Sequence, residues 1–293
     1  MRTPAVQVRN LQKTYDGRAV VDDVSFDIEQ GETFALLGPN GAGKSTTVEI
    51  LEGYRRRSGG TVSVLGVDPE HGGLEWKARL GIVLQVCGQS GLLTVREQLR
   101  QFAGFYPDAR DVDEVISAVG LTAQAKMRTS KLSGGQQRRV DVAMGIIGRP
   151  ELLFLDEPTT GFDPEARREF WELIRGLKAD GTTILLTTHY LDEAAQLADR
   201  VAVIADGRLQ AVGPVDTFGG PQARVPLVRW HEQGVRREQR ATAPLRFVGE
   251  LTERLGHEPE QLEIVRPSLE DIYLELVASA SGVAAADMKE TVR

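Results

Sequence analysis

The sequence predicts an α/β fold in which helices cover both faces of a mostly parallel sheet. Short apolar runs, such as residues 33–37 and 152–155, are typical of strands buried on both faces. These runs alternate with stretches of helical spacing, such as residues 164–178, and this alternation is typical of parallel sheets. The chain has 293 residues, of which 41% are hydrophobic. It can therefore bury a sizeable core without a disulfide or a metal ion.

Composition excludes several functional classes. Lys+Arg 35 against Asp+Glu 42 gives a net charge of −7, and we expect no nucleic-acid partner because phosphate backbones attract basic surfaces. The single cysteine, Cys87, excludes an internal disulfide and fits a reducing cytoplasm. No signal-peptide-like run follows Met1. The most apolar stretches are far shorter than the roughly 20 residues that span a bilayer, so a membrane role requires another chain.

The elements follow in order along the chain. We expect short strands at residues 5–8, 19–21, 24–28, 33–37, 61–65 and 80–84. From residue 91 to 140, helical spacing as in Val95, Leu99 and Phe102 indicates a helical subdomain, about 88–140, inserted in the α/β core. Buried strands at 152–155, 183–186 and 201–204 then alternate with helices at 164–178 and 191–198.

Composition shifts near Gly213, which divides the chain into a domain at 1–213, an α+β appendage at 214–279 and a flexible tail at 280–293. We expect appendage strands at 223–228 and 261–265, a helix at 244–255, and a final helix that begins at Ser268 with Asp271 in a capping-box spacing. The apolar stripe of that helix is either buried within this chain or, with the arginines between Arg224 and Arg240, meets a second protomer or a membrane subunit.

A glycine-rich loop follows the strand at 33–37 and fits G-x-x-x-x-G-K-[ST]. Its residues are Gly38, Pro39, Asn40, Gly41, Ala42, Gly43, Lys44 and Ser45. Glycines let the backbone amides curl toward phosphate oxygens, and the following helix adds the positive end of its dipole. In this loop Lys44 would bridge the β- and γ-phosphates and Ser45 would bind Mg²⁺. A glycine-rich turn without a ligand fits the pattern alone, but the preceding strand and following helix favour the phosphate site.

Two acids, Asp156 and Glu157, end the buried strand at 152–155. Ligands bind at this edge of parallel sheets, so Asp156 would hold the Mg²⁺ shell and Glu157 would orient and deprotonate the attacking water.

A second glycine-rich segment, Leu132-Ser133-Gly134-Gly135-Gln136, places free amides at a helix start and forms a second anion site. A chain with one phosphate loop needs that second clamp only if two copies close on each other's ATP.

Together these motifs resemble the nucleotide-binding subunits of ATP-binding cassette (ABC) transporters, in the family's order across residues 5–213. The resemblance implies a P-loop NTPase with a RecA-like parallel core, an antiparallel β subdomain and a helical subdomain. That subdomain carries the family's signature segment, which in this chain is Leu132-Ser133-Gly134-Gly135-Gln136. It implies ATP and Mg²⁺ as cofactors, with Tyr15 stacking on adenine and Thr46 completing the phosphate loop. Gln85 is implied in catalysis and Mg²⁺ binding, and His189 is the implied switch histidine. In trans, the implied ATP ligands are Ser133, Gly134, Gly135, Gln136 and Asp163.

Within the family, the segment from Pro267 to Leu276 and the sequence around His189 resemble exporter ATPases of the daunorubicin/doxorubicin-resistance type. This implies export of a drug-like, lipid-like or polymeric substrate through a separate multi-span permease, by a cassette homodimer at the cytoplasmic face of the membrane. Two features depart from the family pattern. Phe162 stands where leucine is usual, and residues 86–90 after Gln85 are atypical in the region that contacts the membrane partner.

Two other classes remain as alternatives. A soluble cassette ATPase that moves no solute would share the motifs, but DNA-repair heads need sustained heptads between Gly43 and Ser133, which are missing. Translation-factor types carry two cassettes, whereas this chain has one signature. A kinase with a phosphate loop would leave the signature unexplained.

Overall fold

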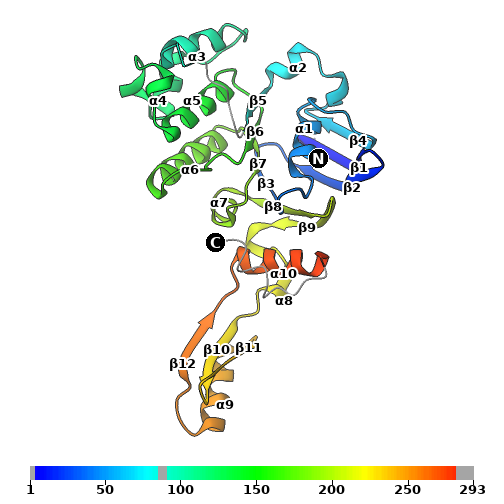
Figure 1. The fold of residues 1–293 in the computed structure, drawn as a ribbon, viewed down its shortest axis with the longest axis vertical. Coiled ribbons are helices and arrows are strands. Elements are labelled where there is room, and N and C mark those ends of the chain that lie inside the picture. Colours follow the sequence, from blue (N-terminus) through cyan, green and yellow to red (C-terminus); the bar gives the residue numbers. More distant parts are fainter. Residues whose placement is uncertain (1–3, 85–90, 282–293) are drawn as a thin grey trace. The chain divides into compact units, whose positions relative to one another are not determined.

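The computed structural model describes residues 4–84 and 91–281. The chain forms two compact units, an N-terminal unit, Met1–Val212, and a C-terminal unit, Gly213–Arg293. Figure 1 shows the elements of each unit.

An antiparallel sheet opens the N-terminal unit, with β1 (Val6–Tyr15), β2 (Arg18–Ile28) and β4 (Gly59–Val64) in the order β2-β1-β4. The prediction of separate strands at 19–21 and 24–28 was wrong, because β2 runs through this segment without interruption. The register between β1 and β2 shifts where Leu11 pairs with Val24 and Lys13 pairs with Val21. Asp23, with φ of 59°, takes up the extra residue as a bulge, so the strand continues through a polar pair that resembles a turn in sequence.

The second sheet has six strands in the order β5-β6-β7-β3-β8-β9. Its strands are β3 (Thr33–Leu37), β5 (Leu80–Val83), β6 (Leu152–Asp156), β7 (Thr183–Thr187), β8 (Arg200–Ala205) and β9 (Arg208–Pro214). The five strands from β5 to β8 pair in parallel, as the sequence predicts. The carboxyl ends of β3, β6 and β7 lie side by side, and each is followed by a segment with a candidate site residue.

Helices fill the connections of this sheet: α1 (Lys44–Leu51), α2 (Leu74–Ala78), α3 (Val95–Ala103), α4 (Val112–Ala118), α5 (Gly134–Ile146), α6 (Pro164–Ala179) and α7 (Leu191–Leu197). Short 3₁₀ turns lie at Pro69–His71, Thr122–Gln124 and Thr129–Lys131. In Figure 1, α3, α4 and α5 lie together on the side of the parallel sheet away from β1, β2 and β4. The parallel sheet covered by helices, the antiparallel β subdomain and the inserted helical subdomain are therefore arranged as the sequence predicts.

The core of the N-terminal unit lies between the two sheets and includes residues of α1. Phe26 of β2 stacks on Phe34 of β3, with ring centroids 5.3 Å apart. Val48, Ile50 and Leu51 of α1 are buried in the same cluster. Burial of these side chains fixes the loop between β3 and α1 at both of its ends.

The C-terminal unit has a three-stranded sheet, order β11-β10-β12, made of β10 (Leu227–Glu232), β11 (Val235–Arg240) and β12 (Glu260–Val265). Its other elements are a 3₁₀ turn (Val215–Thr217), α8 (Gly220–Ala223), α9 (Pro244–Leu255) and α10 (Leu269–Ser281). Val228 and Trp230 of β10 pack with Leu251 of α9 in a small core. The predicted strand at 223–228 was misplaced, since the chain turns helically at α8 before β10 begins.

The final helix begins as predicted. The hydroxyl of Ser268 accepts from the amide of Asp271 at 3.2 Å, and the Asp271 carboxylate accepts from the amide of Ser268 at 3.0 Å. On the apolar stripe of α10, Ile272 and Val277 are buried in the single chain. This favours the first of the two alternatives for the stripe, burial within the chain. Beyond Ser281, the predicted tail lies outside the described residues.

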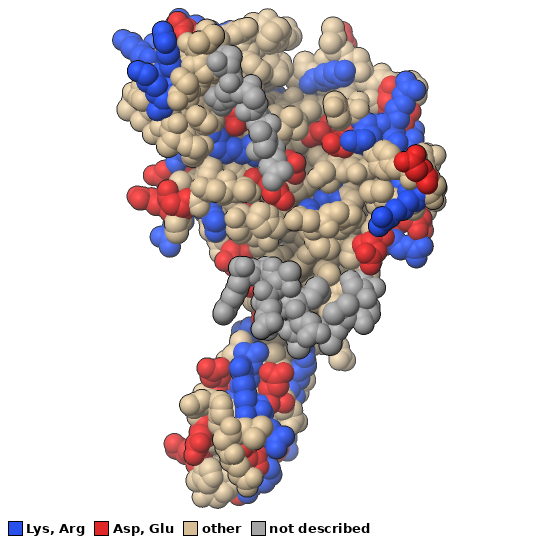
Figure 2. Space-filling view, viewed as in Figure 1, with Lys and Arg blue, Asp and Glu red and all other residues tan. Residues whose placement is uncertain are grey.

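The surface carries both signs of charge. On the face of the N-terminal unit in Figure 2, Lys and Arg side chains are interspersed with Asp and Glu side chains. Among residues 4–84 and 91–281, no helix has both the length and the apolar character needed to cross a membrane.

Glu52, which caps the carboxyl end of α1, is buried, and this gives a pH-dependent contribution to stability. Burial, together with the negative charges of Asp156 and Glu49, raises the pKa of Glu52 from 4.5 to about 8. The folded protein therefore keeps a proton that the unfolded chain loses near pH 4.5, so this group lowers the free energy of unfolding progressively from about pH 4.5 to about pH 8.

Glu52→Gln removes this titration. Without nucleotide, we expect the variant to exceed the wild type by roughly 2–4 kcal/mol in free energy of unfolding at pH 8 and to match it near pH 4.5. Denaturant unfolding across this range measures the difference. A constant difference between the two proteins at every pH would contradict the assignment.

Candidate functional site

The phosphate loop lies between β3 and α1, and its glycines are required by close backbone contacts. Gly43 has φ of 102°, and a Cβ there would lie 2.6 Å from the carbonyl oxygen of Val20. A Cβ on Gly38 would lie 2.2 Å from the carbonyl oxygen of Ile204. Neither position can hold a side chain without displacing backbone, so the sequence folds into this tight curve only with glycine.

Lys44 is buried at the first position of α1. Its ammonium donates to the carbonyl oxygens of Gly38 at 2.6 Å and Pro39 at 3.1 Å. Burial lowers the pKa of Lys44, whereas the charges of Glu157 and Asp156 act in the opposite direction. The loop therefore directs a cation toward the space enclosed by its own backbone. Beside Lys44, Ser45 is exposed and Thr46 is half-buried.

Asp156 lies at the end of β6, next to the end of β7, where its register partner is Thr187. The Thr187 hydroxyl donates to the Asp156 carboxylate. This contact fixes the carboxylate beside the phosphate loop. Thr187 was not among the predicted site residues. The sequence places Thr187 at the end of a buried strand. This position points to a contact with Asp156 only when β6 and β7 are known to be neighbours.

Glu157 has φ of 45°, a left-handed conformation that is uncommon for residues other than glycine. Its amide donates to the carbonyl oxygen of Thr187 at 3.0 Å, and its carboxylate Oε1 lies 3.4 Å from Nδ1 of His189. The hydroxyl of Thr160 lies 3.4 Å from Oε2. The structure thus brings Glu157, His189 and Lys44, three of the predicted site residues, near one another at the carboxyl edge of the sheet. A strained backbone at such a position is typical of a functional site.

Tyr15 ends β1 and its ring is partly exposed, at 36%. Lys13 Nζ lies 4.8 Å and the Arg55 guanidinium 5.5 Å from the ring centroid. The exposed ring offers an aromatic surface on which a base can stack. Gln85, the remaining predicted residue, lies outside the described residues, as do Cys87 and the atypical segment 86–90.

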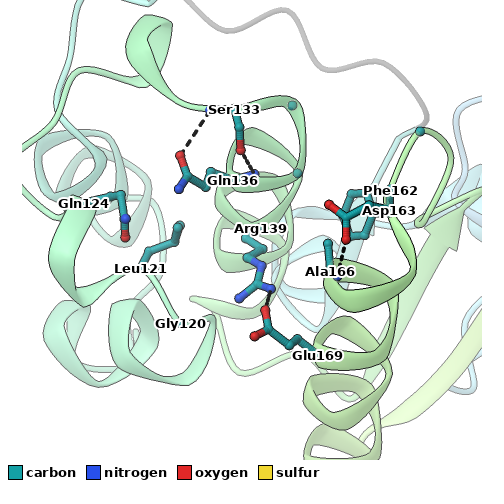
Figure 3. Close-up of a pocket in the computed structure, with 13 residues that line it drawn as sticks. Gly120, Leu121, Gln124, Ser133, Gln136, Arg139, Phe162, Asp163, Ala166 and Glu169 are labelled. Carbon is teal, nitrogen blue, oxygen red and sulfur yellow. Dashed lines mark hydrogen bonds and ion pairs between the residues drawn. The ribbon is translucent and has the colours of Figure 1, made fainter.

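The signature segment caps α5. Ser133 accepts a hydrogen bond at its hydroxyl from the amide of Gln136 at 3.3 Å, and the Gln136 side chain accepts from the amide of Ser133 at 3.1 Å. Figure 3 shows these two contacts between Ser133 and Gln136. The capping box places Gly134 and Gly135 in the first turn, where backbone amides have no intrahelical acceptor. The result is a helix N-terminus suited to an anion.

The signature segment opens onto a cavity of about 410 Å³ between α5 and α6. Phe162 is buried there and packs edge-on against Phe170, with centroids 5.7 Å apart, while Asp163 caps α6 by accepting from the amides of Glu165 and Ala166. The cavity is lined by Gly120, Leu121, Gln124, Ser133, Gly134, Gly135, Gln136, Arg139, Gly161, Phe162, Asp163, Ala166 and Glu169. None of these residues belongs to the phosphate loop, so the signature segment and the phosphate loop open onto different parts of the surface.

The donor set near the phosphate loop fits a magnesium ion that arrives with a nucleotide. A hydroxyl oxygen of Ser45 and a carboxylate oxygen of Asp156 are hard ligands, and Mg²⁺ commonly binds through one or two carboxylates plus phosphates and waters. In the part of the chain that the structure describes, no group of three or more His, Cys, Asp or Glu side chains forms a metal cluster.

Comparison with known proteins decides the family. Residues 21–160 match the family model described as ABC transporter. Nod factor export ATP-binding protein I of Sinorhizobium fredii (strain NBRC 101917 / NGR234) is 36% identical over 293 residues, covering 93% of this chain and 85% of that protein. The chain belongs to the ABC transporter family of ATP-binding proteins. It is therefore an ATP-binding cassette ATPase.

Further comparisons support the same family and fold for this cassette ATPase. The protein of the same name from Neorhizobium galegae is 42% identical over 217 residues, which cover 72% of this chain and 62% of that protein. The chain thus spans less than two thirds of that relative's length. A solved structure of an ATP-binding subunit of an ABC transporter, 25% identical, has a TM-score of 0.70 and covers 94% of this chain and 99% of that one. A dimeric cassette bound to ADP and phosphate has the same fold, with a TM-score of 0.65 at 24% identity.

Proposed function

We propose that this cassette hydrolyses ATP in composite sites formed by two copies and thereby drives export through a separate membrane subunit. The observation that carries the proposal is the convergence of Lys44, Glu157 and His189 in one chain while Ser133 opens onto a different cavity. In this proposal, Lys44, Glu157 and His189 form the part of the site where ATP reacts. Ser133 completes the corresponding site of a facing copy.

ATP first replaces internal contacts of the phosphate loop. The Lys44 ammonium exchanges the carbonyl oxygens of Gly38 and Pro39 for the β- and γ-phosphate oxygens. The loop from Gly38 to Thr46 surrounds the phosphates with backbone amides, and Tyr15 stacks on the adenine. When bound, Mg²⁺ neutralises phosphate charge, held by Ser45, Asp156 and Gln85.

Hydrolysis then depends on Glu157. Its carboxylate accepts a proton from the attacking water as the water oxygen bonds to the γ-phosphorus. The bond between the γ-phosphorus and the β,γ-bridging oxygen breaks, and ADP leaves with that oxygen. His189, 3.4 Å from that carboxylate, orients it and contacts the γ-phosphate. The in-trans ligands Ser133, Gly134, Gly135, Gln136 and Asp163 close on the ATP of the partner copy. Gln85 connects this chemistry to the membrane subunit.

The export role is supported by the names of the relatives, which are Nod factor export ATP-binding proteins. The cargo is proposed only by class: drug-like, lipid-like or polymeric. The daunorubicin/doxorubicin-type resemblance of the segment from Pro267 to Leu276 stays a prediction, since those relatives carry a different export name. The protein is expected at the cytoplasmic face of the membrane, held there by its permease.

Co-purification tests the export role against a soluble mechanical ATPase. The full chain, tagged and expressed in its native cells, is extracted with detergent and its partners are identified by mass spectrometry. We expect a stoichiometric protein with several membrane spans. Recovery of the active ATPase with soluble partners alone would support the alternative class.

A truncation tests whether the C-terminal unit supplies any part of the nucleotide site. All of the proposed site residues precede Gly213, so deletion of residues 214–293 should leave ATP affinity within about threefold of the wild type. The truncated chain should instead be less soluble, or should co-purify less well with the membrane subunit. A folded truncated chain that binds no ATP would contradict this division.

A further inference from the structure

Arg138 lies on α5, two residues beyond the signature segment, and its guanidinium is buried with 8% of the side chain exposed. It was not among the predicted site residues. Its Nε donates to the carbonyl oxygen of Pro158 at 3.0 Å, and Nη2 donates to that of Asp156 at 2.7 Å. Nη1 donates to the carbonyl oxygen of Leu84 and lies 3.9 Å from the carboxylate of Asp141. One side chain thus joins the signature helix to the segments after β5 and β6.

Two of these acceptors flank Glu157 on either side. Glu157 adopts the left-handed conformation, with φ of 45°, which non-glycine residues keep only where the surroundings hold it. The Arg138 guanidinium donates to the carbonyl groups of Asp156 and Pro158 through two N–H groups that are fixed in one plane. This planar geometry holds both carbonyl groups in place, whereas a lysine ammonium on a flexible side chain cannot fix two acceptors in this way.

We propose that Arg138 is a positioning residue that holds the Glu157 carboxylate in its hydrolytic geometry and couples it to the helix that Ser133 begins. A movement of α5, when Ser133 meets the partner's nucleotide, would then be transmitted to Glu157 of the same chain. The inference rests on the proposed role of Glu157. It adds a link between the two nucleotide sites of a dimer.

The main test compares Arg138→Met with Arg79→Met as a matched control. Arg79 lies at the opposite, amino ends of the same two strands, where it donates to Glu151 at 2.6 and 3.0 Å and to the carbonyl oxygen of Leu65 at 3.3 Å. We expect Arg138→Met to lower kcat by roughly 100-fold, the effect of a catalytic group misplaced by about 1 Å. Affinity of the single chain for ATP should be unchanged, and Arg79→Met should keep wild-type kcat.

Arg138→Lys supplies the same test should Arg138→Met fail to fold. Lysine retains the positive charge but cannot donate to the carbonyl groups of Asp156 and Pro158 from one planar group. We therefore expect kcat to fall by about 10-fold or more with ATP affinity unchanged. Wild-type kcat in Arg138→Lys, or equal losses of kcat and ATP affinity, would overturn the proposal.

A double-mutant cycle separates positioning of Glu157 from a general structural effect. In single-turnover assays with radiolabelled ATP, Arg138→Lys should add no further loss to Glu157→Gln, because the group that it positions is already absent. Multiplicative losses would overturn the proposal. If Glu157→Gln itself hydrolyses ATP normally, the proposed function fails; if only the Arg138 variants are normal, the inference alone fails.

Discussion

Glu157→Gln is expected to abolish most ATP turnover while leaving ATP binding intact. The amide keeps the size of the carboxylate but cannot accept a proton from water, and general-base catalysis contributes about 10²–10⁴-fold. We therefore expect kcat to fall by about 10²–10⁴-fold. With ATP bound and unhydrolysed, the closed dimer should accumulate, which size-exclusion chromatography with ATP would detect.

Glu172→Gln is a suitable control, since Glu172 is an exposed acid on α6 whose partner is Arg175. This variant should behave as the wild type in both assays. Wild-type turnover in Glu157→Gln would show that another group activates the water. Loss of ATP binding would show instead that Glu157 acts in the ground state.

Ser133→Arg is expected to abolish ATP-dependent dimerisation. The larger side chain, at the N-terminus of α5, would fill the space that the partner's γ-phosphate must enter and would break the capping box with Gln136. We expect the dimer to weaken by about 100-fold, or about 3 kcal/mol. ATP affinity of the single chain should hold, because the phosphate loop is a separate surface.

Ser117→Arg makes the same change at an exposed serine of α4 that does not line the signature cavity. Dimerisation should survive it. Analytical ultracentrifugation with ATP, in the presence of EDTA to prevent hydrolysis, compares the two variants. An equal loss of single-chain ATP affinity in Ser133→Arg would place the signature in its own chain's site.

The sequence predicts most accurately those features that a local residue pattern determines, such as the phosphate loop and the buried strands. The phosphate loop needs glycine at positions that are crowded by backbone, as at Gly38 and Gly43, so its motif can be recognised without a structure. Continuous apolar runs likewise predict β3, β6 and β7, because both faces of these strands are buried. The roles assigned to residues of the site stay predictions until the variants are measured.

Features that depend on partners distant in sequence were missed. Residues of β11 have no apolar alternation, and the strand exists because it pairs with β10. The bulge at Asp23 arises from register with β1. The contact between Thr187 and Asp156, and the grip of Arg138 on the Glu157 segment, both depend on the order of strands in the parallel sheet. Propensity and local spacing carry none of this information.

The central claim is that each hydrolytic site combines the phosphate loop of one copy with the signature of another. Mixing two inactive variants, Lys44→Ala and Ser133→Arg, tests it most directly. In a mixed dimer, the phosphate loop of the Ser133→Arg chain faces the intact signature of the Lys44→Ala chain, so one of the two sites is whole. Each variant alone should show almost no ATPase activity, because neither can form a dimer with a whole site. An equimolar mixture should regain activity, up to about half of the wild-type rate, since a mixed dimer holds one whole site out of two. A mixture as inactive as its components would contradict the composite site.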